Sequence, residues 1–322
     1  MLRLGRLAFM AALAGSVALF GAIPPHPGVL NYVEGAATID GTGLNSKSIG
    51  SAELAPGQIL STTEGKAELL LTPGVFLRLG DNSAVRMISP GLTDTRVQLL
   101  NGRAMVEATV VHKENNIRIQ EGAAQIALLK SGLYSFDADR GLVAVYDGKA
   151  RVSADDRSVE VKGGREVNVN EPLKAEKFDK KAAAEADPLY AWSKVRSEYL
   201  SEASAASART VVVNNYGWFG GGWYWNPWFG AYSFLPGDGL LYSPFGWGFY
   251  SPFVFYGSTY YYYTPHVHRS PGVIAGAGRV NSGIHPRLGP GIGGPGASSF
   301  SRPGGLNGAR MSGGARGFGG HR

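Results

Sequence analysis

The sequence lacks several features on which enzyme chemistry commonly depends. It contains no cysteine, so disulfide bonds, thiolate metal sites and thiol nucleophiles are excluded. It also lacks the glycine-rich signatures of nucleotide-binding loops and of the nucleophile elbow. His266 and His268 have a spacing suited to a shared metal ion, but a zinc site needs three or four protein ligands and the nearest acidic residue is Asp238. We therefore expect a protein that is not an enzyme and that holds no cofactor or metal.

Long hydrophobic runs are also scarce, with one exception at the amino terminus. Leu7–Phe20 is an uncharged stretch of 14 residues that follows two arginines. Its length suits the core of a secretion signal and is short for a membrane span. Cleavage is less evident, because Leu19 and Phe20 stand where a signal peptidase prefers small residues. We interpret residues 1–22 as a signal peptide or an uncleaved signal anchor, and we expect an exported protein of the periplasm or cell envelope.

Acidic residues are almost missing from the last third of the chain. Residues 209–322 contain eight arginines and one aspartate, but no lysine and no glutamate, so this segment carries a formal charge of +7. The whole chain of 322 residues carries +6, which leaves residues 1–208 close to neutral. An anionic envelope polymer is therefore a candidate partner. Residues 313–320 resemble arginine-glycine segments that bind RNA, but the export signal argues against a nucleic-acid partner.

Short runs of alternating apolar and polar residues fill residues 28–170, and glycine-containing turn signals separate them. The clearest example is centred on Asp147-Gly148, where the pattern predicts a strand, a tight turn and an antiparallel return strand. The same pattern recurs around Glu34-Gly35 and Asn101-Gly102, and Pro73-Gly74 predicts a further turn between two strands. We therefore expect a mainly β fold, in which residues 28–170 form an antiparallel β-sandwich or roll.

A series of motifs within this β region resembles the FecR-type domain. Each motif is short, and their order along the chain gives the resemblance its specificity. They share a glycine or a Pro-Gly pair beside alternating apolar residues. The motifs are Leu54-Ala55-Pro56-Gly57-Gln58, residues 70–79 with Asn82-Ser83, residues 97–102, residues 132–136 and residues 143–148.

The resemblance implies a regulatory role. The namesake members of the family are inner-membrane regulators, in which a cytoplasmic amino-terminal segment controls a sigma factor and a periplasmic part senses an outer-membrane transporter. In this sequence only six residues precede the apolar run. We therefore expect an exported protein that carries the β domain without the cytoplasmic regulatory segment.

Lysine, glutamate and alanine dominate after the β region, and we expect residues 173–208 to form a short helical connector. Asp187 followed by Pro188 predicts a helix start, because aspartate caps the first turn and proline fits its first position. Arg196 lies off the apolar stripe that follows. This stripe indicates a face packed on the β domain or, alternatively, a partner-binding face. It consists of Leu189, Trp192, Val195 and Tyr199.

Residues 216–263 hold 22 of the 35 aromatic residues of the chain and a single charge, at Asp238. Frequent glycine and proline argue against a transmembrane helix there. Three interpretations compete: a compact packing unit on the β domain, adhesion to a surface or membrane interface, and stacking on sugars or aromatic ligands. The candidate ligand-binding residues are Trp218, Trp223, Trp225, Trp228 and Trp247. The glycine-, proline- and arginine-rich tail that follows, residues 264–322, is expected to be disordered.

Together these features favour an exported, non-enzymatic binding or scaffold protein of the periplasm or cell envelope. Two alternatives stay open, namely a periplasmic sensor that signals through a separate membrane partner and a glycan-binding envelope protein. The candidate partners are an envelope protein, an anionic surface polymer and a glycan. Membrane association through the amino-terminal segment or the aromatic segment is a further expectation.

Overall fold

The structure is a computed structural model that describes residues 25–214 and 220–259. All of these residues belong to one compact unit. The expected export signal, Trp218 and the arginine-rich tail lie outside the described residues. In the part of the chain that is described, no helix combines the length and the hydropathy needed to span a membrane.

Strands β1 to β15 form one continuous hydrogen-bonded sheet. All strand pairs in it are antiparallel except β6 with β8, so the predicted mainly β, antiparallel fold is confirmed. The strands are β1 (Leu30–Ile39), β2 (Thr42–Gly43), β3 (Ile59–Leu70), β4 (Val75–Leu79), β5 (Ala84–Gly91), β6 (Asp94–Asn101), β7 (Arg103–Ala108), β8 (Arg118–Glu121), β9 (Ala124–Leu128), β10 (Gly132–Asp137), β11 (Leu142–Asp147), β12 (Lys149–Ala154), β13 (Arg157–Lys162), β14 (Arg165–Asn168) and β15 (Glu176–Lys177). Two short 3-10 helices, Ser46–Ser48 (η1) and Lys113–Asn115 (η2), interrupt them.

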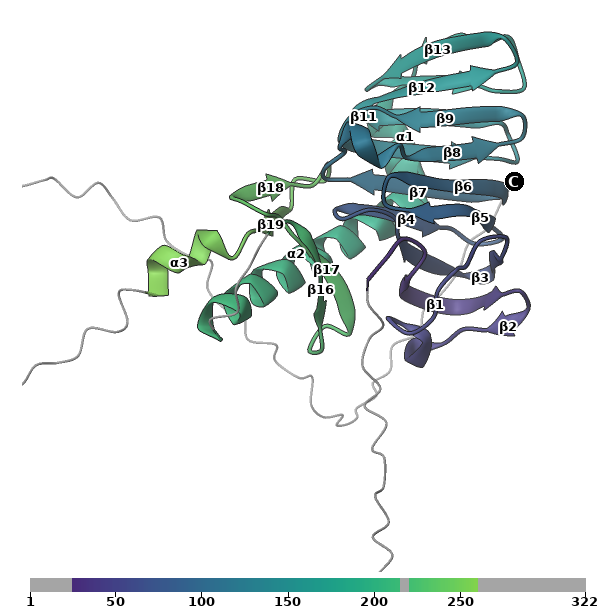
Figure 1. The fold of residues 1–322 in the computed structure, drawn as a ribbon. Coiled ribbons are helices and arrows are strands. Elements are labelled where there is room, and N and C mark those ends of the chain that lie inside the picture. The colour runs from purple at the N-terminus through teal and green to yellow at the C-terminus, as the bar shows by residue number, and fades with distance from the viewer. Residues whose placement is uncertain (1–24, 215–219, 260–322) are drawn as a thin grey trace, which may run out of the picture. The chain divides into compact units, whose positions relative to one another are not determined.

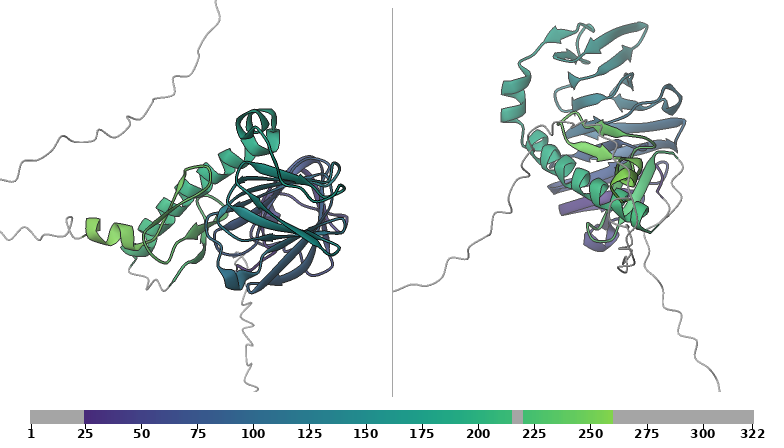
Figure 2. Two further views of the ribbon diagram at one scale, coloured as in Figure 1. Left: turned by 90° about the horizontal axis from the view of Figure 1, so that it is seen from above. Right: turned by 90° about the vertical axis from the view of Figure 1, so that its left-hand side faces the viewer.

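The sheet curls into a roll because its long strand β3 belongs to two halves. The first part of β3 pairs with β5, its last part pairs with β4, and β1 runs along its other side. One half continues through β6, β8, β9, β12 and β13, and the other through β7, β10, β11, β14 and β15. Seen from above, the strands enclose a core (Figure 2) that both halves fill, with Leu77 and Val106 from one half and Val97 and Ile126 from the other.

The hairpin predicted at Asp147-Gly148 is wrong, because β11 and β12 do not pair with each other. Strand β11 pairs with β10 and β14, whereas β12 pairs with β9 and β13. The same holds at Asn101-Gly102, and Glu34-Gly35 lies inside β1 beside a register shift. The glycines are therefore corners at which the chain bends or passes from one half of the roll to the other. By contrast, Pro73-Gly74 joins the paired strands β3 and β4, as predicted.

Two helices follow the roll, α1 (Lys180–Ala186) and α2 (Pro188–Val213). The predicted start of α2 is confirmed, because the Asp187 side chain accepts a hydrogen bond from Leu189 N and Pro188 occupies the first turn. The helix runs to Val213, five residues beyond the predicted connector. The predicted apolar stripe is wrong in part, since Val195 is 63% exposed whereas Arg196 is buried.

The buried face of α2 consists largely of small side chains, among them Ser197, Ser201 and Ser204. These allow the following segment to approach the helix closely. Four strands and a helix lie in that segment: β16 (Gly222–Asn226), β17 (Ala231–Leu235), β18 (Leu240–Tyr242), β19 (Gly248–Tyr250) and α3 (Phe253–Thr259). We call residues 220–259 the aromatic lobe. It packs on α2 (Figure 1), and its Phe234 and Phe249 join the Phe76 side chain of the roll in one apolar cluster.

Candidate functional site

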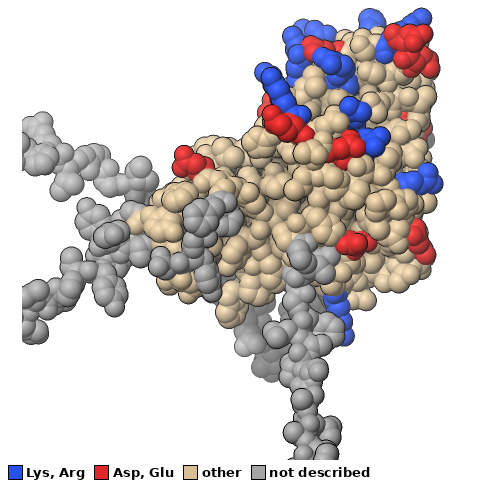
Figure 3. Space-filling view, viewed as in Figure 1, with Lys and Arg blue, Asp and Glu red and all other residues tan. Residues whose placement is uncertain are grey.

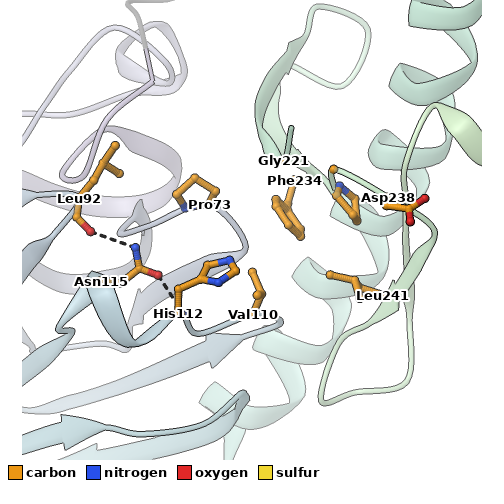
Figure 4. Close-up of a pocket in the computed structure, with 11 residues that line it drawn as sticks. Pro73, Leu92, Val110, His112, Asn115, Gly221, Phe234, Asp238 and Leu241 are labelled. Atoms are coloured by element: carbon orange, nitrogen blue, oxygen red, sulfur yellow. Dashed lines mark hydrogen bonds between the residues drawn. The ribbon is translucent and has the colours of Figure 1, made fainter. Parts of the chain in front are cut away.

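A pocket of about 410 Å³ lies at the seam between the roll and the aromatic lobe. The loops that follow β3, β5 and β7 supply one wall, and the lobe supplies the other (Figure 4). The wall on the roll consists of turns and loops, because β3, β5 and β7 all end at this edge of the roll. The roll contributes Pro73, Leu92, Val110, His112 and Asn115, and the lobe contributes Gly221, Phe234, Pro236, Gly237, Asp238 and Leu241.

The pocket is mainly apolar, and three polar side chains line it. The amide of Asn115 is engaged within the roll, because it donates to Leu92 O at 3.0 Å and accepts from His112 N at 3.2 Å. The imidazole of His112 and the ring of Phe234 stand on opposing walls, and Asp238 supplies the carboxylate (Figure 4). Apolar walls with a few polar groups are typical of sites for small, mostly apolar molecules. Among the described residues there is no cluster of three or more metal-ligating side chains.

A buried ion network joins α2 to the outer face of the roll next to this seam. Glu68 on β3 follows the core residue Ala67, so its side chain points outward toward the helix. Arg78 Nε donates to Glu68 Oε2 at 2.7 Å, and Arg78 Nη1 donates to Glu107 Oε2 at 2.6 Å. Arg196 of α2 completes the network by donating from Nη2 to Glu68 Oε1 at 2.9 Å. All four charged side chains are buried.

The neighbouring charges decide the protonation of these carboxylates. Burial acts to raise the pKa of Glu68, but the guanidinium groups of Arg196 and Arg78 outweigh burial and hold this pKa below its usual range. Burial raises the pKa of Glu107, because Arg78 and the Ser197 hydroxyl compensate only in part. The network therefore sets two guanidinium groups against two carboxyl groups in a buried environment, where removal of one charged side chain leaves its partner uncompensated.

The lobe is attached to the same network through one amide side chain. Asn31 Nδ2 donates to Glu68 Oε1 at 2.9 Å and to Tyr232 O at 3.0 Å, while Asn31 Oδ1 accepts from Tyr232 N at 2.7 Å. Ser197 Oγ of α2 contacts both Glu107 and Ser243. Roll, helix and lobe therefore share one set of buried polar contacts.

The tryptophans predicted to bind ligand lie in different environments. Trp223 is buried and contacts Phe76 and Phe234 edge to face. Trp225 packs on Tyr232, and Trp247 is half-buried. Trp228 is 94% exposed at the turn between β16 and β17. The four described tryptophans thus do not form one stacking surface, and a ligand role for any of them stays a prediction.

Sequence reasoning missed the pocket and the ion network. His112 and Asn115 belong to a loop without any recognisable motif, and Asp238 is the one acidic residue of the aromatic segment. Glu68 and Arg78 alternate with core residues, which is the signal of an outward-facing pair. Nothing in the local sequence indicates that a helix starting 120 residues later covers them, so their burial could not be foreseen.

Comparison of the chain with known protein families and structures identifies one matching family. Residues 58–170 match the family described as FecR protein. Two crystal structures of a candidate anti-sigma factor from Parabacteroides distasonis are similar at 15% identity and a TM-score of 0.33. Each match covers 39% of this chain and 62% of that chain, so the similarity spans less than two thirds of these neighbours. No curated protein sequence matches. By this sequence match, the segment 58–170 of the chain is a FecR-type domain.

Proposed function

We propose that the chain is a non-catalytic sensory module that works outside the cytoplasm and signals through a separate membrane partner. The observation that carries this proposal is the FecR-type domain at residues 58–170. The apolar run within residues 1–22 is the motivation for the location. Binding without catalysis is consistent with a pocket whose polar groups are one imidazole, one amide and one carboxylate.

The way in which the seam is built supports a role in sensing. The pocket has one wall on the roll and the other on the lobe, so a ligand seated there contacts both. The buried network that includes Glu68, Arg196 and Asn31 connects the same two parts. Binding of a ligand can therefore change the position of the lobe relative to the roll. A partner that contacts both parts would bind the two arrangements with different affinities.

Affinity capture with the full chain from the cells that produce it tests this function. We expect an inner-membrane or transporter protein to be recovered with the chain after crosslinking. Val110→Phe fills the pocket and should lower that recovery at least about fivefold, because a fivefold change is the lower end of typical coupling between two sites. Val195→Phe is the matched control, since Val195 is exposed on α2 and does not line the pocket.

Two results would contradict the proposal. Recovery of polysaccharide or lipid alone would favour the envelope scaffold or the glycan-binding protein instead. Fractionation that finds the chain wholly in the cytoplasm would remove the exported location and with it all three hypotheses.

A further inference from the structure

A second cavity, of about 390 Å³, lies on the outer face of the roll and shares no residue with the pocket at the seam. Strands β7, β10, β11 and β14 form its floor, and α1 with the segment just before it supplies the rest of the wall. Tyr146 of the floor belongs to one apolar cluster with Phe178 and Ala183, so α1 packs on this face of the sheet. The volume is within the usual range for small-molecule sites. We call this cavity the α1 pocket.

The strand register places a hydroxyl and a carboxylate on either side of a small floor residue. Ser135 on β10 pairs with Ala144 on β11, and Ala144 pairs with Glu166 on β14. The three side chains share the outer face, because paired residues of neighbouring antiparallel strands point to the same side. Neighbouring strands are about 4.8 Å apart, so the backbones of Ser135 and Glu166 are roughly 10 Å apart. The methyl group of Ala144 leaves the space between them open.

Two buried hydroxyl groups line this cavity without a hydrogen-bond partner among the described residues. Ser135 is only 7% exposed and Tyr146 only 8% exposed. Burial raises the pKa of Tyr146 to about 12, and the charge of Asp187, which also lines the cavity, contributes to this increase. Buried polar groups normally have partners, and a molecule bound in the α1 pocket can supply them for both hydroxyls.

The α1 pocket has an excess of negative charge. Two arginines and four acidic residues line it, which gives a net formal charge of −2. They are Arg103, Arg140, Asp137, Glu166, Asp179 and Asp187. On the face shown in Figure 3, charged side chains gather over the roll, whereas the aromatic lobe is mostly uncharged. Recognition by charge therefore belongs to the roll, and the sign of this cavity favours a cation.

Some of these charges are compensated within the structure, but the charge of Glu166 is not. Arg103 Nη2 lies 2.6 Å from Asp187 Oδ2, and Asp179 caps the first turn of α1. Glu166 has no hydrogen bond or salt bridge to its side chain among the described residues. Burial raises the pKa of Glu166, and the charge of Arg140 opposes this increase only in part. Because Arg140 is exposed, water screens its charge, and a cation bound beside Glu166 would stabilise the ionised carboxylate.

Aromatic rings form one corner of the α1 pocket. The ring centres of Tyr146 and Phe178 are 5.2 Å apart, and the two planes are nearly perpendicular at 88°. The face of an aromatic ring attracts a neighbouring cation. The described residues contain no cluster of three or more metal-ligating side chains, so a metal ion matches these groups poorly. An organic ammonium group matches them better, because it donates hydrogen bonds and is attached to an apolar body.

We propose that the α1 pocket binds a small organic amine in its cationic form. The ammonium group lies between the Glu166 carboxylate and the Ser135 hydroxyl, and the carbon skeleton lies against Tyr146 and Phe178. This site is distinct from the pocket at the seam. The proposal goes beyond the sensory function and does not depend on it.

Isothermal titration calorimetry of the full chain near neutral pH, with three probes of similar size, tests this proposal. The probes are 2-phenylethylamine, which is a cation, 2-phenylethanol, which is neutral, and 3-phenylpropanoate, which is an anion. We expect the amine to bind at least about tenfold more tightly than the alcohol, because its hydrogen bonds are charge-assisted. The anion should bind more weakly still. Equal affinity for amine and alcohol would overturn the proposal, and so would a preference for the anion, which would indicate a site organised by Arg140.

Variants locate the binding. Glu166→Gln removes the charge at nearly constant size and should weaken amine binding about tenfold. Glu64→Gln is the matched control, because it removes the same charge from an exposed position on β3 outside the cavity. Ala144→Leu fills the floor without changing the charge and should also weaken binding. Unchanged affinity in Glu166→Gln would overturn the proposal.

The pocket at the seam provides a further control. Val110→Phe fills that pocket and should leave amine binding unchanged, because Val110 does not line the α1 pocket. Loss of amine binding in this variant would place the amine at the seam and overturn the proposal. No partner protein enters these titrations, so their outcome is independent of the capture experiment that tests the sensory function.

Discussion

Glu121 is an inward-facing carboxyl group in an apolar surrounding. It follows Ile119 by two positions on β8, so both side chains point into the core of the roll. Glu121 is buried, and neither carboxylate oxygen has a hydrogen-bond partner among the described residues. Burial, and to a smaller extent the charge of Asp137, raises the pKa of Glu121 from 4.5 to about 7.

This raised pKa predicts that the roll loses stability as the pH rises. Below pH 4.5 the carboxyl group is protonated in both the folded and the unfolded chain, and the folded state carries no penalty. Between pH 4.5 and about pH 7, Glu121 ionises in the unfolded chain but stays largely protonated in the folded chain. The free energy of unfolding therefore falls as the pH rises. Above that range the loss in the free energy of unfolding is at most about 3.5 kcal/mol, from roughly 1.4 kcal/mol for each pKa unit.

Thermal unfolding of the wild type and of Glu121→Gln between pH 5 and pH 8 measures this effect. Glutamine cannot ionise, so the difference in melting temperature between the two proteins should change in favour of the variant as the pH rises. The comparison isolates Glu121 from Glu107, whose raised pKa is common to both proteins. Parallel pH profiles for the two chains would show that Glu121 does not titrate in this range.

At the level of elements, Gly148 explains how β11 is connected to β12. Its φ is +92°, and a Cβ atom there would lie 2.5 Å from the Tyr134 hydroxyl. The Tyr134 hydroxyl donates to Lys130 O and accepts a hydrogen bond from Lys149 N at 3.1 Å, and it thereby holds the corner. Gly148→Ala should destabilise the roll by about 1–3 kcal/mol, because it combines an unfavourable backbone conformation with a steric clash.

Gly122→Ala is the control for that substitution. Gly122 also has a positive φ, +55°, but nothing lies within 4 Å of the position of its Cβ atom. Urea unfolding of both variants separates the steric contribution from the backbone contribution. We expect Gly148→Ala to unfold at a clearly lower urea concentration than Gly122→Ala, and equal midpoints would show that the contact with Tyr134 is unimportant.

The same corners show what could be predicted from the sequence at this scale. Strand positions were predictable, because alternation between core and solvent is a local property. Strand partners were not, because a hairpin turn and a corner between two halves of the roll both need glycine at positive φ, as at Gly102 and Gly148. For α2 the cap at Asp187 was predictable from two residues. Its buried face was not, because that face depends on β17, which follows about 20 residues after the helix.

The candidate site was less predictable than the fold for a related reason. An abundance of tryptophan identified the aromatic segment as important, but side-chain chemistry does not distinguish the buried Trp223 from the exposed Trp228. Only the packing of the lobe on Phe76 decides which ring is covered. The pocket likewise exists only once the lobe lies against the loop that carries His112.

At the scale of the whole molecule, the aromatic lobe completes the fold of the roll. Phe76 and Leu70 point away from the roll core and are covered by Trp223, Phe234 and Phe249 of the lobe. Without the lobe these side chains would face water. The FecR-type domain of this chain is therefore expected to depend on residues beyond position 170.

Two truncations test this dependence. A chain that ends after Ala208 loses the end of α2 and the whole lobe, and we expect it to lose at least about 1.5–3 kcal/mol of stability, which is the cost of exposing one buried phenylalanine side chain to water. A chain that ends after Thr259 keeps every described element and should match the full chain. Calorimetry of the three proteins provides the measurement, and equal melting temperatures would mean that the roll is stable alone.

The buried network has a consequence for the speed of folding. Asn31 meets Tyr232 across 201 positions of sequence, and Glu68 meets Arg196 across 128. Contacts between such distant segments form late, because the intervening chain must first be closed into a loop. The outer face of the roll is therefore covered by segments that are synthesised more than 100 residues after its own strands, since Arg196 follows Glu68 by 128 positions. Until α2 has been synthesised and has docked, Glu68, Glu107 and Arg78 lack the guanidinium group of Arg196. During synthesis the partly folded roll therefore presents a charged surface that is complementary to a later segment of the same chain.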